Sequence, residues 1–507
     1  FHDNNAIQYA WLGMLAGNTG RVFVVGDDDQ SIYGWRGARV ENVQHFVRDF
    51  PDVRTVRLEQ NYRSTGTILE AANALITHNS SRMGKELWTA GAPGEPIRLY
   101  AAFNEQDEAR FVVDRIQQWI DSGRRADEAA VLYRTTAQSR LFEEYLLREN
   151  IAYRVYGGQR FFERTEVKDA LAYLRLLLNP NDDAALERVI NKPTRAIGAK
   201  TVAMLRAQAR EAGVTLWQAA NAALAQGVFA TRAGTAVANF VRLIEGMRER
   251  MQDWTLGNQT QGVIDESRLA DHYAKEPQER METRMENLRE LVNAADAFIM
   301  PQEDAEAGLD ELQSFLSHAA LEAGETQGES WDDCVQLMTL HSAKGLEFPL
   351  VFVAGMEDGL FPHQRSVDEA AGRLEEERRL CYVGMTRAME ELFLSYAEIR
   401  RMHGSENYCR PSRFIDEMPA RLLQEIRPRM STGRPYRSAR PKPVARSHSV
   451  VDDSWPFRLG EPVLHPKFGE GTVLAFEGSG EHTRVHVNFG AVGAKWLVLA
   501  YANLQSA

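Results

Sequence analysis

The residues that could carry chemistry are concentrated in one short stretch, Asp27 to Arg36, which reads Asp-Asp-Asp-Gln-Ser-Ile-Tyr-Gly-Trp-Arg. The amide of Gln30 could orient a water molecule or sense a terminal phosphate oxygen. The rings of Tyr33 and Trp35 could stack on bases, and Arg36 could pair with a backbone phosphate. A turn with a core tryptophan is the alternative for each residue taken singly. The whole string, however, indicates a site where a nucleotide and a nucleic acid meet.

The elements that must position this stretch are those of an α/β fold. An apolar run at 22–25 predicts a strand buried on both faces, and ligands of open α/β sheets bind outside the carboxyl ends of such strands. Gln30 would lie there. Further strands are predicted at 55–58, 129–133, 335–339 and 350–354, with helical stretches such as 67–78 and 105–121 between them. This alternation is typical of α/β proteins.

Between about Phe161 and Trp331 the pattern changes to long amphipathic runs, for example 199–212 and 282–297, which predict helices. Because strand signals resume at Val335, a helical domain apparently interrupts the second α/β region, which is completed after it. The acidic stretch 302–311 predicts a solvated loop near the exit from this insertion.

The C-terminal part has two compositions. From about Glu425 to Val450 the chain is rich in Arg, Pro and Ser, which predicts a disordered linker, either a simple tether or a loose contact with DNA phosphates. After it, residues 462–473, 483–489 and 495–498 alternate like short strands joined by Gly-rich turns. These segments predict a small β-barrel.

Composition restricts the kind of protein. With a formal net charge of −12 over 507 residues, the surface cannot be broadly basic, so any nucleic-acid binding must rest on local clefts. The three cysteines, Cys334, Cys381 and Cys409, lack metal-binding spacing, which argues against a disulfide framework and a zinc site. No apolar run is long enough to span a bilayer and no signal peptide opens the chain. A cytoplasmic protein is predicted.

Four segments occur in an order that resembles one known family. Residues 24–38 resemble motif III of the UvrD/PcrA/Rep group of superfamily 1 DNA helicases. Residues 58–64, 339–348 and 376–388 resemble motifs IV, V and VI of the same group. The resemblance covers the whole chain, and the C-terminal part favours UvrD or PcrA over Rep.

This resemblance implies an α/β fold class with RecA-like motor lobes of the P-loop NTPase type, the first one incomplete. An all-helical insertion and a small C-terminal Tudor- or SH3-like β-barrel complete it. The implied boundaries are 1–60 for the remainder of the first lobe (1A), 61–160 for the first part of the second lobe (2A), 161–330 for the helical insertion (2B), 331–424 for the completion of 2A, 425–453 for a basic linker and 454–507 for the Tudor-like domain.

Two features of the family are missing from the sequence. No Gly-x-x-x-x-Gly-Lys-Ser/Thr phosphate loop occurs in it. Residues 1–8 resemble the end of motif II, so the Mg²⁺-binding Asp and water-activating Glu of that motif would precede Phe1. His2 stands where the family has Gln. We expect an N-terminally truncated helicase that is inactive by itself.

On the nucleotide side, the resemblance implies ATP as cofactor, with Mg²⁺ whose principal protein ligands are absent. Arg63 and Arg387 would contact the γ-phosphate and Gln30 would act beside them, since such arginines stabilise the transition state. A salt bridge to the glutamates at 375–377 is the alternative for Arg387. Tyr62 would stack on adenine, or else be a half-buried core residue, and Glu347 would accept from the ribose hydroxyls.

On the DNA side, Tyr33, Trp35 and Arg36 would meet single-stranded bases and phosphates, while Thr339 and His341 would contact the backbone. In the helical insertion, residues 193–198 resemble the Gly-Ile-Gly hairpin that grips duplex phosphates in the family, with alanine in place of its first glycine and Gly198 as the second. No protein metal ligands are predicted. The other histidines considered are expected to be structural: His45, His78 and His318.

The implied function is that of an ATP-dependent 3′-5′ DNA helicase and single-strand translocase in DNA repair and replication. Its partners would be single-stranded DNA, single-strand/duplex junctions, repair proteins and, through the C-terminal domain, RNA polymerase. A non-catalytic remnant that binds DNA or RNA polymerase is the first alternative. A helicase-nuclease subunit of the RecB or AddA kind is the second, although no nuclease carboxylate-lysine cluster follows motif VI.

Overall fold

The computed structural model describes residues 1–17, 21–50, 53–80, 82–324, 333–368, 371–402, 405–427, 462–465, 469–477, 484–489, 493–498 and 505–506. The chain divides into two compact units, Phe1–Met430 and Ser431–Ala507. Most of the predicted linker at 425–453 lies outside the described residues.

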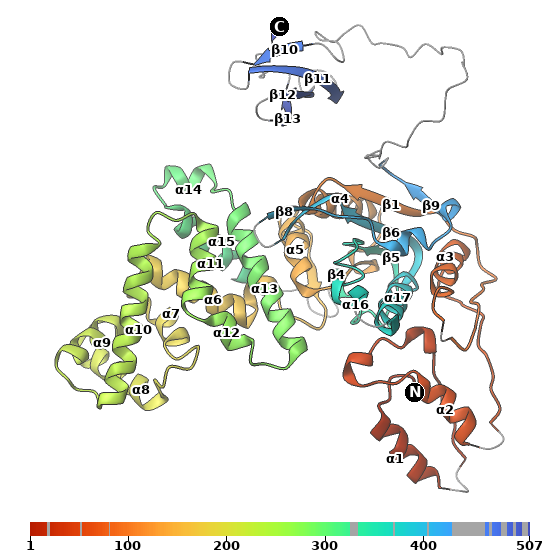
Figure 1. The fold of residues 1–507 in the computed structure, drawn as a ribbon, viewed down its shortest axis with the longest axis horizontal. Coiled ribbons are helices and arrows are strands. Elements are labelled where there is room, and N and C mark those ends of the chain that lie inside the picture. Colours follow the sequence, from red (N-terminus) through yellow and green to blue (C-terminus); the bar gives the residue numbers. More distant parts are fainter. Residues whose placement is uncertain are drawn as a thin grey trace. The chain divides into compact units, whose positions relative to one another are not determined.

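A parallel sheet of seven strands forms the centre of the first unit (Figure 1). In spatial order its strands are β3 (Tyr153–Val155), β4 (Val335–Thr339), β2 (Ala129–Tyr133), β5 (Phe348–Val353), β6 (Ala388–Ala397), β1 (Ile97–Ala102) and β9 (Leu423–Glu425). All six pairings between neighbours are parallel. The predicted strands at 129–133, 335–339 and 350–354 are thereby confirmed, and with them the α/β fold class.

Both faces of this sheet are covered by helices. Along β2, Ala130 and Leu132 pack in one core with α3 (Gly66–Ile76) and α17 (Ala371–Met385). Val131 and Tyr133 point the other way, into a second core with α4 (Glu105–Asp121) and α5 (Ser139–Arg148). Burial on both faces explains why the strands read as continuous apolar runs. Short helices α16 (Gln364–Asp368) and α18 (Arg413–Asp416) and the hairpin β7 (Ile399–Met402) and β8 (Ser405–Tyr408) complete this region.

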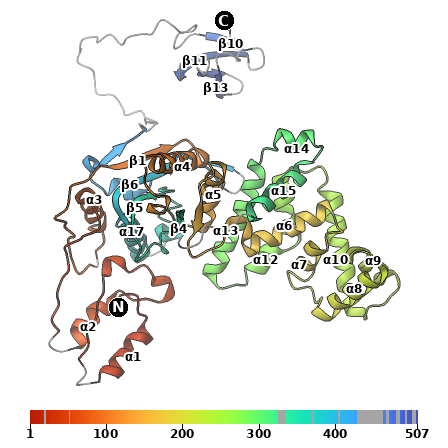
Figure 2. The same cartoon turned by 180° about the vertical axis from the view of Figure 1, so that it is seen from behind.

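A helical region interrupts the sheet in sequence but not in space. Strands β3 and β4 are neighbours with Tyr153 opposite Val335, although the intervening chain is helical. Its helices are α6 (Thr165–Leu178), α7 (Asp183–Val189), α8 (Ala199–Ala212), α9 (Leu216–Ala225), α10 (Thr231–Arg250), α11 (Leu256–Glu266), α12 (Leu269–Tyr273), α13 (Gln278–Ala297), α14 (Gln302–Glu306) and α15 (Glu311–Gly324). All of these helices except α14 contribute residues to one apolar core, and the helices form a group of their own beside the sheet in both views (Figure 2). The predicted loop at 302–311 is wrong in part, since α14 begins there.

The first sixty residues differ most from expectation. They contain α1 (Ala6–Ala16), α2 (Glu41–Asp49) and two 3-10 turns, η1 (Asp28–Gln30) and η2 (Gly34–Arg36). The strands predicted at 22–25 and 55–58 are wrong: neither segment forms a helix or strand, and Phe23 is 93% and Leu58 80% exposed. An apolar run becomes a buried strand only where neighbouring strands flank it, and none of the described strands does so here.

The second unit contains antiparallel strands, in agreement with the predicted small β domain. They are β10 (Pro462–His465), β11 (Gly469–Glu477), β12 (Arg484–Phe489), β13 (Gly493–Val498) and β14 (Gln505–Ser506), in the order β13-β12-β11-β10-β14. Within the described part of the chain, no helix combines the length and apolar character needed to cross a membrane.

Candidate nucleotide and nucleic-acid sites

The aromatic tip of the first stretch, Tyr33, Trp35 and Arg36, is built on the 3-10 turn η2. The Tyr33 and Trp35 rings meet edge to face with centroids 6.1 Å apart. The Arg36 guanidinium carbon lies 4.4 Å from the centre of the Trp35 ring and 5.3 Å from that of Tyr33. Trp35 is 44% exposed, which excludes the alternative of a core tryptophan. The tip therefore presents an accessible ring backed by a cation.

Thr339 and His341, from the carboxyl end of β4, lie against this tip. The His341 ring centroid is 6.3 Å from that of Tyr33 and 6.4 Å from that of Trp35, and the Tyr33 hydroxyl donates to the His341 carbonyl at 3.3 Å. Thr339 Oγ1 and Ser342 Oγ are hydrogen-bonded at 3.0 Å, so the turn after β4 is held by its own side chains. Burial, with the charge of Arg134 nearby, lowers the pKa of His341 to about 3. His341 is therefore neutral at physiological pH.

These two elements line one cavity of about 860 Å³. All five predicted DNA-contacting residues outside the helical region lie in its wall: Tyr33, Trp35, Arg36, Thr339 and His341. We call this cavity the groove. Gly198, the sixth, is the N-cap of α8 and lies outside the wall of the groove. The structure thus brings together five of the six residues.

Sequence reasoning missed Arg134 and Glu377, which also line the groove. Arg134 directly follows β2, and its Nη2 donates to Glu377 Oε1 of α17 at 2.7 Å. Glu377 also accepts from the His363 backbone N–H at 3.1 Å. Arg134 could have been found by the rule applied to Gln30, since it stands at the carboxyl end of a buried strand.

Three residues predicted on the nucleotide side lie together: Tyr62 and Arg63 are adjacent in sequence, and Arg63 contacts Glu347. Arg63 Nε donates to Glu347 at 2.6 Å, and its Nη1 donates to the Thr386 carbonyl at 3.2 Å. Tyr62 is 85% exposed, so it is not the half-buried core residue that was the alternative. Its ring is free to stack on a planar ligand.

Arg387 is fully buried but has only uncharged partners among the described residues. Its guanidinium donates to the Val383 and Leu346 carbonyls at 2.9 and 3.1 Å and to Thr386 Oγ1 at 3.0 Å. The alternative of a salt bridge with the glutamates at 375–377 is not observed. Burial and the charge of Arg63 lower the pKa of Arg387 to about 10. A buried cation beside a second cation is a place that fits an anionic group such as a phosphate.

Gln30 has a different partner from the one expected. Its amide donates to Asp27 at 2.6 Å, and no hydrogen bond among the described residues joins it to Arg63 or Arg387. The backbone carbonyl of Gln30 accepts from Lys344 Nζ at 2.9 Å. Lys344 also binds both carboxylate oxygens of Asp3, at 2.8 and 2.7 Å. Lys344 therefore ties the turn after β4 to the first residues of the chain.

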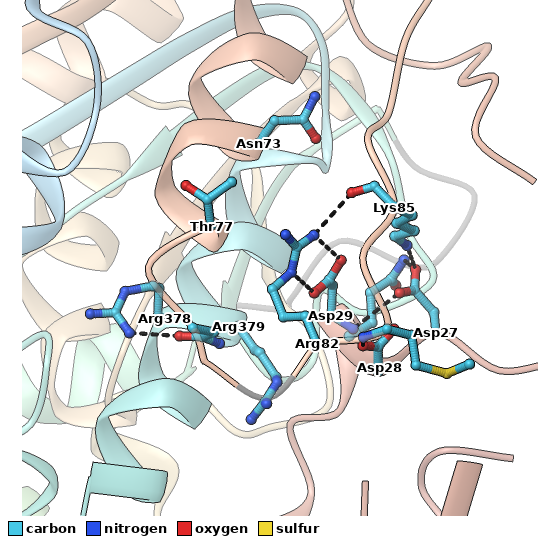
Figure 3. A network of polar contacts seen from close by, with 12 residues as sticks. Asp27, Asp28, Asp29, Asn73, Thr77, Arg82, Lys85, Arg378 and Arg379 are labelled. Atoms are coloured by element: carbon cyan, nitrogen blue, oxygen red, sulfur yellow. Dashed lines mark hydrogen bonds and ion pairs between the residues drawn. The ribbon is translucent and has the colours of Figure 1, made fainter. Parts of the chain in front are cut away.

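Three neighbouring aspartates, Asp27, Asp28 and Asp29, could in principle hold a metal ion. Their carboxylates are already paired, as Figure 3 shows. Arg82 donates twice to Asp29, both bonds being 2.7 Å long, and Lys85 binds Asp27. Asp28 accepts from the Met83 backbone N–H at 2.7 Å. Because these carboxylates already bind cations or a backbone N–H, the cluster as it stands does not fit Mg²⁺.

Comparison with known proteins identifies the family. The model of the UvrD-like helicase C-terminal domain matches residues 56–399, that of the UvrD/REP helicase N-terminal domain matches 1–51, and that of the PcrA/UvrD tudor domain matches 459–505. DNA helicase II of Escherichia coli K12 is 56% identical over 506 residues, covering 100% of this chain and 69% of the relative. The ATP-dependent DNA helicase PcrA of Bacillus subtilis 168 is 39% identical over 521 residues, with 100% and 69% covered. The chain therefore belongs to the UvrD-like helicase family.

Proposed function

We propose that this chain belongs to an ATP-dependent DNA helicase that moves 3′ to 5′ along single-stranded DNA, and that it supplies the DNA-binding groove and part of the ATP site. One observation carries the proposal: the aromatic tip and the end of β4 converge on the groove. A stacking ring, a cation and neutral hydrogen-bonding groups in one cavity suit a single strand, whose bases are free to stack and whose phosphates need only a few cations. The net charge of −12 suits a local site better than a basic surface.

In this proposal, Trp35 and Tyr33 stack on bases, Arg36 pairs with a phosphate, and Thr339 and His341 contact the backbone. A neutral His341 acts as a hydrogen-bonding group rather than as a cation, because its pKa lies far below physiological pH. Gly198, at the start of α8, would contact duplex phosphates through its backbone at a single-strand/duplex junction. Its separation from the groove suits two sites for two forms of DNA.

On the nucleotide side, we propose that Tyr62 stacks on adenine, Glu347 accepts from the ribose, and Arg63 and Arg387 stabilise the γ-phosphate. Bound ATP would supply the phosphoryl group whose hydrolysis drives movement. Arg387 supports this role because its guanidinium has no carboxylate partner among the described residues, whereas Arg63 must leave Glu347 or share it. Gln30 would act there only after leaving Asp27. No step is assigned to Mg²⁺, because the aspartates present do not fit it.

Three finer expectations belong to the same proposal. The 507 residues, in which no phosphate-loop motif occurs, would not hydrolyse ATP by themselves, and measurable DNA-stimulated turnover would contradict this. The protein would act in the cytoplasm, in DNA repair and replication. The tudor-like unit would bind a protein, with RNA polymerase as the partner to be tested by co-purification with and without residues 431–507.

Single-strand binding is tested by the fluorescence anisotropy of a labelled oligothymidylate and of a labelled duplex of the same length. We expect the chain to prefer the single strand, and Trp35→Ala to weaken binding by roughly tenfold, as the loss of one stacked base would. Trp254→Ala is the matched control, because Trp254 is 42% exposed and lies in the helical region, outside the groove. Equal losses in both variants, or no preference for the single strand, would refute the proposal.

A further inference from the structure

One contact of the groove joins two segments that lie far apart in sequence, η2 and α17. Glu376, in the middle of α17, lies beside Glu377, and its Oε1 accepts from the Gly34 backbone N–H at 2.8 Å. Gly34 is the first residue of η2, the turn that carries Trp35 and Arg36. The aromatic tip is thus attached by its backbone to a helix of the second lobe.

The contact leaves no free space. A Cβ added to Gly34 would lie 2.5 Å from Glu376 Oε2 and 3.0 Å from Oε1. Gly34 does not have a left-handed φ, so a side chain here would meet only the carboxylate end of Glu376, which would have to move away from the Gly34 N–H. Burial raises the pKa of Glu376, and the Gly34 N–H opposes that rise. The carboxylate is therefore held in a partly desolvated place by this hydrogen bond.

Helix α17 also connects the tip to the nucleotide side. It runs without interruption from Ala371 to Met385, and Arg387 follows two residues after its end. Glu377, the next residue of the helix, binds Arg134, which follows β2 and also lines the groove. A helix is a rigid element, so Glu376 and Glu377 together set the distance between the tip and the end of β2.

We propose that Glu376 is a positioning residue for single-strand binding, which holds the aromatic tip against His341 through the Gly34 N–H. This inference rests on the proposed function and names a residue that determines the geometry of its binding site. Because α17 leads to Arg387, Glu376 is also the contact through which a movement of α17 would reach the tip.

The test compares three variants of the full chain in the oligothymidylate assay. Glu376→Ala removes the acceptor, and we expect affinity to fall by about tenfold, the effect of losing one hydrogen bond to a charged group. Glu376→Gln keeps an acceptor oxygen for the Gly34 N–H and should stay within about threefold of wild type. Glu375→Ala is the control, because Glu375 accepts from the Ser80 backbone N–H and hydroxyl at 2.8 and 2.7 Å and not from the tip.

A double-mutant cycle and a local probe separate positioning from a general loss of stability. Gly34→Ala should weaken binding by displacing the carboxylate. The double variant, Gly34→Ala with Glu376→Ala, should bind the oligothymidylate no less tightly than whichever single variant has the lower affinity. In 5-fluorotryptophan-labelled protein, the Trp35 ¹⁹F resonance, assigned with Trp35→Phe, should shift in Glu376→Ala without DNA and stay unchanged in Glu375→Ala.

Additive effects in the cycle, or an unchanged affinity and resonance in Glu376→Ala, would overturn the inference. Failure of the proposed function is distinguishable from this. If the wild-type chain binds no single strand, the proposed function falls, while the ¹⁹F shift still decides whether Glu376 positions the tip.

Discussion

The buried Arg387 offers a quantitative test of whether a residue is kept for function at the expense of stability. Burial and the charge of Arg63 lower its pKa from 12.5 to about 10. Arg387 is charged in both the folded and the unfolded chain at neutral pH, so the folded state carries this cost throughout the physiological range. The cost disappears only as the pH rises above about 10. The difference in pKa corresponds to roughly 3 kcal/mol against the folded state.

Replacing Arg387 by methionine removes that cost but also removes three hydrogen bonds. Each bond lost from this charged donor costs about 1.5 kcal/mol, so the two effects largely offset each other. We expect Arg387→Met to change the free energy of unfolding by no more than about 2 kcal/mol. Arg400 is the matched control: burial opposes its charge too, but Glu357 and Glu108 outweigh burial and raise its pKa.

Removing one partner of such a buried ionic network costs about 3–5 kcal/mol, so Arg400→Met should lower the thermal unfolding midpoint sharply. Differential scanning calorimetry of both variants provides the comparison. Pyrophosphate should raise the midpoint of the wild type and of Arg400→Met, but not that of Arg387→Met. If Arg387→Met were as destabilising as Arg400→Met, Arg387 would be a structural residue and the reasoning would be wrong.

Three further predictions concern other parts of the first unit. Ala196 has a φ of +61°, a conformation that costs alanine about 1–2 kcal/mol. Ala196→Gly should therefore stabilise the chain by about 0.5–1 kcal/mol and raise the thermal unfolding midpoint. An unchanged or lower midpoint would contradict this. Because the pKa of His341 falls from 6.5 to about 3 on folding, stability is lost as the pH drops from 6.5 towards 3. His341→Asn should reduce that loss, measured as unfolding midpoints over a pH series. An identical pH profile in the variant and the wild type would contradict this prediction. Asp29→Ala leaves Arg82 without its carboxylate and should lower the free energy of unfolding by about 3 kcal/mol. Adding Arg82→Met to Asp29→Ala should recover most of that loss. Added Mg²⁺ should leave the unfolding midpoints of all these proteins unchanged.

Much of the fold could be predicted from sequence patterns because its elements are determined locally. The predicted helices at 105–121 and 199–212 begin and end where α4 and α8 do, since amphipathic periodicity marks both, with Asn104 as the N-cap of α4 and Gly213 as the C-cap of α8. The segment at 22–25 is as apolar as β2, and the segment at 55–58 alternates polar and apolar residues, but among the described residues neither has a neighbouring strand. Burial depends on such neighbours, which a local pattern does not contain.

The groove was predictable only as a set of residues, not as an arrangement. Motif spacing indicated that Trp35 and His341 act on the same ligand, and the structure places their rings 6.4 Å apart. The ionic contacts that build the walls were not predictable in this way. Lys344 binds Asp3 and Glu376 binds Gly34 across more than three hundred residues, and no local signal specifies such a pairing.

The central claim is that an ATP-hydrolysing motor uses Arg387 at the nucleotide and the groove at the DNA. The most direct measurement joins the N-terminal part of Escherichia coli DNA helicase II ahead of Phe1 and records the rate of ATP hydrolysis with and without single-stranded DNA, for the wild type and Arg387→Ala. We predict strong stimulation by DNA in the wild type and a loss of about 10³-fold or more in the variant, as expected for an arginine that stabilises a phosphoryl-transfer transition state. Equal rates in the two proteins, or no stimulation by DNA in either, would contradict the account and favour a protein that binds DNA or a polymerase without catalysis.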